Sequence, residues 1–299
     1  MLFSLPSMLT ALQHINPKSN LKLLDSILEV STGNTRDASS VKQIVDKITP
    51  KYHGFEQRDA HEFISDIIDN MQEEIIKVKL PRNNISPIDI YFRMDLRIFL
   101  TCDNCQYRRS RDEVYRHLSL DITNATSVSE AISNYFQEDT VHLDCEKCSG
   151  KTATRTLQIV RLPKALLLHL KRFIVSPSLT QPFRKNKAAV DYSNTLSLRQ
   201  FSCQNVTLPS SPSLPSLVQD DSTKTNPLSY SLKSLVHHIG SNANCGHYVT
   251  DAFCVNEAVM DGECWKRFDD SNVSSITRDD VVSEESKKNA YMLLYELNV

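Results

Sequence analysis

Two Cys-x-x-Cys motifs constrain the fold of this chain more than any other feature of its sequence. Cys102 and Cys105 form the first motif, Cys145 and Cys148 form the second, and residues 106–144 separate the two. A Cys-x-x-Cys turn holds two sulfurs on one tight loop, and two such turns complete a tetrahedral site with Zn–S distances of about 2.3 Å. The spacing predicts a structural zinc site that joins two hairpin tips distant in sequence. Four free thiols, or two redox pairs, are the alternatives.

The composition is that of an ordinary globular protein. Of its 299 residues, 40% are hydrophobic and 23% are charged, and the net charge is −2. A balance so close to neutral argues against nucleic acid or a membrane surface as a partner. No stretch approaches the ~18 uninterrupted apolar residues of a membrane span. The start, "MLFSLPSMLTALQH", lacks the basic region and cleavage site of a signal peptide. We therefore expect an intracellular protein, in the cytoplasm or the nucleus, where paired cysteines favour metal over disulfides.

The first ~85 residues are predicted to form an α-rich lobe, with boundaries good to a few residues. In "QRDAHEFISDIIDNMQEEII", residues 57–76, apolar side chains recur at helical spacing and the opposite face is charged. Residues 7–48 are also mostly helical in pattern, with a break near "STGNTRDASS".

Strand patterns dominate from about residue 89. Alternating apolar and β-branched residues predict strands in "IDIYFRMDLRIFLTC", "HLSLDI", "TATRTLQIVRLP", "ALLLHLKRF", "YSLKSLVHHIG", "GHYVTDAFC" and "AYMLLYEL". Ser127 and Glu130 have the spacing of a capping box ahead of a short helix, "AISNYF". Residues 174–228 are rich in Ser, Pro and polar residues, and we interpret them as a long, mobile surface loop rather than a second domain. The expected fold class is therefore α+β.

His247 is the candidate general base. It follows Gly246, and the residues after it have a strand pattern that would hold the imidazole on a rigid support. Downstream, Asp269 and Asp270 lie where a strand gives way to a polar loop, and a carboxylate that binds the ring N–H fixes the tautomer of a histidine. On spacing alone, an ordinary histidine and a solvated turn are the alternatives.

Four stretches, taken together, resemble the ubiquitin-specific protease family of cysteine deubiquitinases. They are "GFEQRDAHEFISDII", the twin Cys-x-x-Cys followed by "LPKALLLHLKRF", then "CGHYVTDAF", and finally "WKRFDDSNVSSI" with "AYMLLYEL". They occur in the order of that family and span most of the chain. The stretches "YSLKSLVHHIGSNANCGHYVTDAF" and "LFSLPSMLTAL" look closest to the subgroup of ubiquitin carboxyl-terminal hydrolase 37.

The resemblance implies one papain-like catalytic domain described as a hand. The helical thumb would be residues 1–88, the zinc-bearing β fingers residues 89–158, and the β palm residues 159–299, with the mobile insert at about 174–228. Ubiquitin would rest on the fingers and palm, and its C-terminal tail would enter the cleft between thumb and palm. Ubiquitin and ubiquitinated proteins are thus the implied partners of what we expect to be a monomer.

The resemblance also implies roles for single residues. His247 matches the general base of the family, Asp269 the residue that orients it, and Asp270 a neighbouring acid that assists. On the thumb, a motif that shapes the cleft is matched by Gln57, Asp59, His61 and Glu62. For those four, and for Glu62 above all, a solvent-facing helix start is the alternative.

The nucleophile of that chemistry is missing from the chain. The family supplies a cysteine in a stretch resembling "GNTCYMN", near a helix N-terminus that helps to lower the thiol pKa. Here the first cysteine is Cys102, which belongs to the zinc set, and Cys245 is too close to His247 in sequence to face it across a cleft. We therefore expect the domain to be N-terminally incomplete and the polypeptide not to hydrolyse ubiquitin conjugates.

Three interpretations remain open from the sequence. The first is an active deubiquitinase whose nucleophilic cysteine lies outside this chain, which the retained His247, Asp269 and Asp270 favour. The second is a pseudoenzyme that binds ubiquitin without catalysis. The third is a zinc-dependent interaction scaffold, which explains the cysteines but not the ordered motifs downstream.

Overall fold

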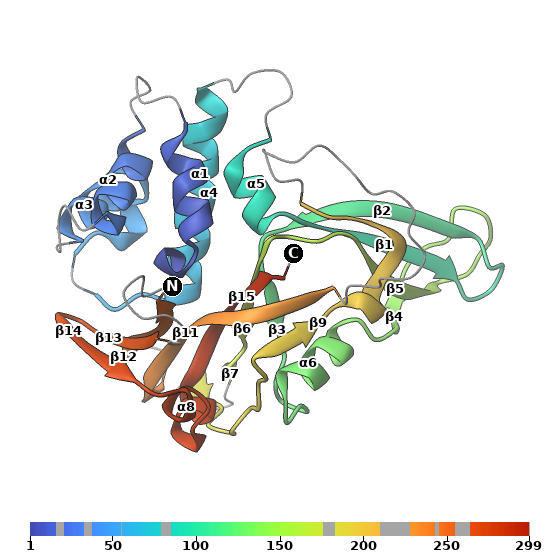
Figure 1. The fold of residues 1–299 in the computed structure, drawn as a ribbon. Coiled ribbons are helices and arrows are strands. Elements are labelled where there is room, and N and C mark those ends of the chain that lie inside the picture. The colour runs from blue at the N-terminus through green and yellow to red at the C-terminus, as the bar shows by residue number, and fades with distance from the viewer. Residues whose placement is uncertain are drawn as a thin grey trace, which may run out of the picture.

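The computed structural model describes residues 1–15, 21–32, 38–54, 56–78, 85–175, 183–209, 228–242, 245–254 and 264–298. Helices gather in the N-terminal part of the chain, on one side of a large sheet, and a second sheet extends away from them (Figure 1). The α+β architecture predicted from the sequence is therefore confirmed.

Short helices build the N-terminal part, which we call the helical lobe. In order, they are η1 (Leu2–Ser4), α1 (Pro6–Gln13), α2 (Lys22–Ser31), α3 (Ser39–Ile48), η2 (Pro50–Tyr52), α4 (Ala60–Lys77) and α5 (Pro87–Phe92). The break expected near "STGNTRDASS" falls between α2 and α3. Within the described ranges, no helix is both long enough and apolar enough to cross a bilayer.

Helix α4 is the amphipathic helix predicted from residues 57–76. Asp59 caps it, because its carboxylate accepts a hydrogen bond of 3.0 Å from the backbone N–H of Glu62. The apolar stripe expected from the spacing is buried at Ile67, Met71 and Ile75. The stripe packs into a core shared with α1, α2 and α5.

Helix α5 corrects one strand prediction. The sequence pattern predicts a strand from residue 88 onward, but Pro87–Phe92 is helical and β1 begins at Met94. Ser86 caps the helix by accepting a hydrogen bond from the N–H of Ile88, and Pro87 occupies the first turn, where its missing N–H costs nothing. These two start signals outweigh the β-type pattern of the residues that follow.

The smaller sheet has five strands in the order β10-β5-β1-β2, with β4 also paired to β5. Its strands are β1 (Met94–Cys102), β2 (Arg108–Tyr115), β4 (Asp139–His142), β5 (Thr152–Arg161) and β10 (Ser202–Thr207). Strand β1 runs antiparallel to β2 and β5, so the β1–β2 turn and the β4–β5 turn lie at the same end of the sheet. Each of these two turns carries one Cys-x-x-Cys motif.

The larger sheet has eight strands in the order β14-β13-β12-β11-β15-β6-β3, with β9 also paired to β11. Its strands are β3 (Leu118–Leu120), β6 (Ala165–Leu170), β9 (Thr195–Ser197), β11 (Ser229–Asn242), β12 (Cys245–Cys254), β13 (Cys264–Asp269), β14 (Asn272–Ile276) and β15 (Ala290–Leu297). The other elements are β7 (Phe173–Val175) with β8 (Phe183–Lys185), η3 (Arg199–Phe201), and the helices α6 (Val128–Tyr135), α7 (Arg278–Val281) and α8 (Glu284–Asn289).

Both faces of the centre of the larger sheet are buried. On β15, Met292 and Leu294 pack into the core of the helical lobe, whereas Leu293 and Tyr295 pack into the core on the other face. A strand covered on both faces has no solvent side that needs polar residues, which explains the unbroken apolar run "AYMLLYEL". The larger sheet is therefore the common wall of two hydrophobic cores.

Part of the predicted insert at 174–228 is structured. Residues 183–209 contain β8, β9, η3 and β10, and Val190, Leu196 and Leu198 are buried in the core. This part of the segment is therefore not the surface loop that its composition indicated, because its few apolar residues are placed to fill the core. Residues 176–182 and 210–227 of the insert lie outside the described residues.

Helix α6 begins where the sequence predicted. The hydroxyl of Ser127 accepts a hydrogen bond from the N–H of Glu130, as in a capping box. The Glu130 carboxylate, however, accepts from the N–H and the hydroxyl of Thr126, one residue before the cap. The Ser127 half of the predicted capping box is therefore present, whereas the Glu130 carboxylate bonds to Thr126 instead of to the backbone N–H of Ser127.

Arg172 joins the end of β6 to the segments around it. Its side chain is completely buried and donates hydrogen bonds to four backbone carbonyls, those of Ala290, Asn186, Ala188 and Lys287. Burial lowers the pKa of the Arg172 guanidinium to about 10. A guanidinium has five donors and needs several acceptors when it leaves water, so this one side chain holds four carbonyl positions together.

A cluster of histidines joins the helical lobe to the larger sheet. The His61 ring, at the start of α4, stacks on the His169 ring of β6 with centroids 3.9 Å apart, and lies edge-on to the His117 ring at 4.3 Å. Ser119 and His169 Nδ1 are 3.0 Å apart, within hydrogen-bonding distance. Burial, together with the neighbouring histidines, lowers the pKa of His117 to about 4 and that of His169 to about 2. The rings are therefore neutral in the folded protein at neutral pH.

Mild acid should loosen this contact between the lobe and the sheet. The folded pKa of His117 lies below the unfolded value of about 6.5, so its contribution to stability is present above pH 6.5 and is lost as the pH falls from there towards 4. We expect the melting temperature of the wild type to fall over that range, and the slope to be smaller in His117→Phe. Thermal melts at a series of pH values measure this. The control His142→Phe, at the exposed end of β4, should keep the wild-type slope, and an unchanged slope in His117→Phe would contradict the prediction.

Candidate active site and metal centre

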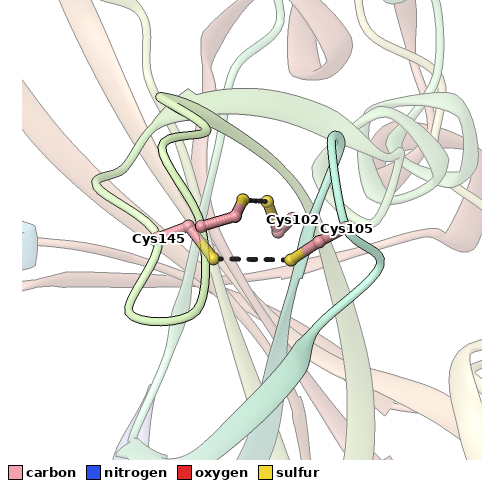
Figure 2. Close-up of side chains that lie close together, drawn as sticks. Cys102, Cys105 and Cys145 are labelled. Carbon is pink, nitrogen blue, oxygen red and sulfur yellow. Dashed lines mark hydrogen bonds between the residues drawn. The ribbon is translucent and has the colours of Figure 1, made fainter.

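The two Cys-x-x-Cys motifs meet at one end of the smaller sheet. Cys102 ends β1 and Cys105 lies in the turn that follows, while Cys145 and Cys148 lie in the β4–β5 turn. The sulfurs of Cys105 and Cys145 face each other (Figure 2). Cross-motif Sγ–Sγ distances are 3.7 Å for both Cys102–Cys148 and Cys105–Cys145, and all four sulfurs lie within 4.8 Å of one another. A tetrahedral zinc ion with Zn–S bonds of about 2.3 Å separates its sulfurs by about 3.8 Å, so the four side chains fit such an ion.

Two hydrogen-bond donors support a thiolate at Cys148. The N–H of Gly150 donates to Cys148 Sγ at 3.3 Å, and the amide of Asn104 donates to the same sulfur at 3.4 Å. The hydrogen bonds from Asn104 and Gly150 lower the pKa of the Cys148 thiol to about 6. A Cβ added at Gly150 would lie 3.0 Å from Cys102 Sγ, so a glycine is required where the backbone passes this close. Asn104 and Gly150 had not been singled out from the sequence, and the only signal was their place within and just after the two motifs.

The imidazole of His247 lies next to the carboxylate of Asp269. His247 is on β12, Asp269 ends β13, and His247 Nε2 is 2.6 Å from Asp269 Oδ1. Both side chains are partly open to solvent, with 44% and 48% of their surfaces exposed. Asp270 follows in the turn to β14 with a φ of +52°, a conformation that aspartate adopts more readily than most residues. The structure therefore brings together the three residues that the sequence singled out.

Electrostatics favour the protonated form of His247. The hydrogen bond to Asp269 raises the pKa of the imidazole, and the negative charges of Asp269 and Asp270 act in the same direction. With Nε2 held by Asp269, Nδ1 remains to accept and return a proton. The pair can therefore serve as an oriented general base.

The segment that leads into α4 reaches the strand of His247. The side-chain oxygen of Gln57 accepts a hydrogen bond of 2.9 Å from the N–H of Gly246, which immediately precedes the histidine. The carboxylate of Asp59 accepts a hydrogen bond from the hydroxyl of Tyr291 on β15. These two contacts hold the start of α4 against the larger sheet beside His247.

The two other members of that motif have different environments. His61 packs in the histidine cluster described above, whereas Glu62 forms a salt bridge of 2.6 Å with Lys51 and has 52% of its side chain exposed. The solvent-facing alternative thus describes Glu62 well. Only Gln57 of the four contacts the strand that carries His247 through its side chain.

A thiol partner for His247 is absent from the described part of the chain. All eight cysteines are free and lie in described residues, and none of their sulfurs hydrogen-bonds the His247 ring. Cys245 precedes His247 by two residues on the same strand and is exposed. The described residues thus hold an imidazole–carboxylate pair to which no thiol is hydrogen-bonded.

A comparison with models of known protein families identifies the family of this chain. The family model described as "Ubiquitin carboxyl-terminal hydrolase" matches residues 4–295. The chain belongs to the ubiquitin carboxyl-terminal hydrolase family. Its closer resemblance to the subgroup of ubiquitin carboxyl-terminal hydrolase 37 stays a prediction.

Relatives with established names are members of the same family. Ubiquitin carboxyl-terminal hydrolase 2 of Bos taurus is 28% identical over 311 residues, which cover 92% of this chain and 46% of that protein. Ubiquitin carboxyl-terminal hydrolase 29 of Mus musculus is 27% identical over 215 residues, which cover 65% of this chain and 24% of that protein. The chain therefore spans less than half the length of these curated relatives.

Solved structures of the family share the fold. The Ubp8/Sgf11/Sus1/Sgf73 DUB module of SAGA bound to ubiquitin aldehyde matches with a TM-score of 0.74 and 23% identity, over 100% of this chain and 65% of the matched chain. The module bound to monoubiquitin matches with a TM-score of 0.72 and 24% identity, over 99% of this chain and 63% of the other. The papain-like fold expected of a ubiquitin-specific protease is thereby confirmed.

The contact between His247 and Asp269 can be tested by titration. In Asp269→Asn the pKa of His247 should fall towards the ordinary value of about 6.5, because the hydrogen bond to a carboxylate is the largest cause of its elevation. Asp270→Asn should give a smaller fall, since that carboxylate acts only through its charge. NMR titration of the His247 ring protons measures both values. An unchanged pKa in Asp269→Asn would show that the two side chains are not in contact in solution.

Proposed function

We propose that this chain is the body of a ubiquitin-specific protease domain that takes part in thiol-dependent hydrolysis of peptide and isopeptide bonds at the C-terminus of ubiquitin. The observation that carries the proposal is the 2.6 Å contact between His247 and Asp269, at the place where Gln57 links the helical lobe to β12. The proposal is supported by the family of the chain and by solved relatives whose titles name bound ubiquitin.

As part of this proposal, we assign to the chain the hand that the family resemblance implies. In this proposal, residues 1–88 are the thumb, residues 89–158 the fingers, and residues 159–299 the palm. Ubiquitin rests on the fingers and palm, and its tail runs towards His247 between palm and thumb. Ubiquitin and its conjugates are thus the proposed partners of a monomer that works inside the cell, in the cytoplasm or the nucleus.

The residues of this chain supply proton transfer in the proposed reaction. His247 takes the proton of a cysteine thiol, whose sulfur attacks the carbonyl carbon, and returns the proton to the leaving amine. Water then attacks the acyl-enzyme and His247 acts as base once more. Asp269 holds the ring through Nε2 and stabilises the imidazolium, and Asp270 adds negative charge nearby. None of the described cysteines is hydrogen-bonded to His247, so this structure does not identify the reacting thiol.

Activity is tested on the longest natural product that contains this sequence. We expect it to hydrolyse a fluorogenic ubiquitin substrate, and His247→Ala to lower kcat by at least about 1,000-fold because triad members act as a unit. Asp270→Asn should keep most of the activity. The 299-residue chain by itself should bind ubiquitin without turnover.

The alternatives give different results in the same measurements. Ubiquitin binding by the natural product with no turnover and no labelling by a ubiquitin probe would identify a pseudoenzyme. Absence of both turnover and ubiquitin binding would leave only an interaction scaffold. Turnover that survives His247→Ala would show that the proposed base is wrong.

We further propose that Cys102, Cys105, Cys145 and Cys148 hold a structural zinc ion. The support is the tetrahedral fit of the sulfurs and the preference of a set of four thiolates for zinc or an iron–sulfur centre. With four protein ligands no position remains for substrate, so the ion would supply a cross-link between the β1–β2 and β4–β5 turns.

Metal analysis should find one zinc ion per chain. Cys148→Ser is expected to lose the metal and to lower the melting temperature, because the two turns then lose the cross-link that the ion supplies. Elemental analysis and thermal melts measure the two effects. Cys203→Ser, in β10, is the matched control and should keep both metal and stability. Purified protein that is free of metal and melts at the same temperature with and without a chelator would contradict the zinc site.

A further inference from the structure

Asp251 is a buried carboxylate close to the proposed base, and the mechanism does not use it. It lies on β12, four residues after His247, and its side chain has no exposed surface. A carboxylate without water is costly unless cations and hydrogen-bond donors surround it. Its position on the same strand as His247 therefore needs a reason.

Two side chains from the neighbouring strands meet Asp251. Arg267 of β13 donates through Nε at 2.7 Å and through Nη2 at 2.8 Å, one bond to each carboxylate oxygen. His237 of β11, which is also buried, places Nε2 at 2.9 Å from Oδ2. Burial by itself would raise the pKa of the Asp251 carboxyl, but the bonds from Arg267 and His237 prevail and hold it below its usual value. The carboxylate is thus charged and is held from both sides.

These groups share one face of the sheet with the proposed catalytic pair. On β12, His247 and Asp251 are separated by an even number of residues, and on β13 the same holds for Arg267 and Asp269. Arg267 is directly opposite Asp251 in the β12–β13 register. The contact between His247 and Asp269 is the diagonal one, further along the same two strands. One face of this strand pair therefore carries two polar contacts in series.

The register of β13 decides whether Asp269 can reach His247. A slip of one residue would turn both Arg267 and Asp269 to the other face. A slip of two residues would move Asp269 by about 7 Å along the strand, either out of reach of His247 or to the position directly opposite it. Either slip would also take Arg267 away from Asp251 and leave a buried charge without its cation. The two-bond contact therefore opposes every register except the observed one, in which Asp269 meets His247 along the diagonal.

We propose that Arg267 and Asp251 are positioning residues, whose ion pair, with its carboxylate buried and its guanidinium partly exposed, sets the register that brings Asp269 to His247. The contact of His237 with Asp251 fixes β12 in the same way against β11, its neighbour on the other side. The inference rests on the proposed role of His247, but the contact that it explains can be measured in the chain without any activity.

The variant Arg267→Gln separates positioning from simple electrostatics. The charged groups near His247 are Asp269 and Asp270, and Arg267 in turn interacts with Asp251, Asp269 and Asp280. If Arg267 acted only as a nearby positive charge, its removal would raise the pKa of His247. If it positions Asp269, its removal weakens the hydrogen bond to His247 and the pKa falls towards about 6.5. The two accounts therefore predict shifts of opposite sign.

NMR titration of His247 in the 299-residue chain decides between them, and we expect the pKa to fall. The matched control is Arg97→Gln, which removes an arginine that also forms two bonds to a directly opposite aspartate, Asp112, but on β1 and β2 of the smaller sheet. The control should leave the pKa of His247 unchanged. A rise or no change in a folded Arg267→Gln protein would overturn the proposal.

A second variant covers the case in which Arg267→Gln does not fold. The double variant Asp251→Asn with Arg267→Gln leaves no unpaired buried charge and keeps the net charge of the chain. The direct effects of the two lost charges on His247 oppose each other, so a fall in the pKa reports the position of Asp269. An unchanged pKa in the folded double variant would also overturn the proposal.

Turnover gives a separate readout in the longest natural product that contains this sequence. There the double variant should lower kcat about tenfold with a much smaller change in KM, because the pair acts on the position of Asp269, and a tenfold loss corresponds to about 1.4 kcal/mol of barrier. If the wild-type product has no turnover, the proposed function fails, while the titration still tests the positioning. If turnover is normal in the double variant, the positioning fails while the function stands.

Discussion

A buried carboxylate must be paired, and in this protein that requirement acts on three strands at once. Asp251 of β12 is bonded to Arg267 of β13 and to His237 of β11, so the strands that carry the base, its acid and the wall of the core cannot shift independently. Hydrophobic packing tolerates several similar arrangements, whereas a buried carboxylate that accepts two directed hydrogen bonds from one guanidinium restricts the strands to a single register. The position of Asp269 against His247 at the exposed site therefore depends on the contacts of the buried Asp251 carboxylate beside it.

The same sheet explains why the site lies at a junction. Strands β6, β11 and β15 are covered on one face by the helical lobe and on the other by the second core, which leaves the β12–β14 side as the place where polar groups reach solvent. Gln57 comes from the lobe to this side and binds Gly246, while Asp59 binds Tyr291 on β15. A substrate tail that passes between lobe and sheet would meet His247 there.

Features with a local physical cause could be predicted from the sequence. The turns at Cys102 and Cys145 follow from spacing, α4 follows from its periodicity and the Asp59 cap, and the pairing of His247 with Asp269 follows from the order of the family motifs. Helix α5 was missed because a cap at Ser86 and a proline decide six residues whose own pattern is β-like. The composition-based prediction for residues 183–209 is wrong because a Ser- and Pro-rich segment as a whole hides the apolar side chains, Val190, Tyr192, Leu196 and Leu198 among them, that enter the core.

The buried pair was beyond sequence reasoning for a different reason. Asp251 sits in "HYVTDAF" and Arg267 in "WKRFDD", where each looks like an ordinary polar residue of a half-exposed strand, and only the β12–β13 register makes them opposite. The two contacts, His247 with Asp269 and Arg267 with Asp251, differ in solvent exposure, and this difference suits them to different roles. A pair that is nearly half exposed can gain and lose a proton near neutral pH, as a general base must. A pair with no exposed carboxylate surface keeps its charge over that range, and so it can hold geometry while its neighbour titrates.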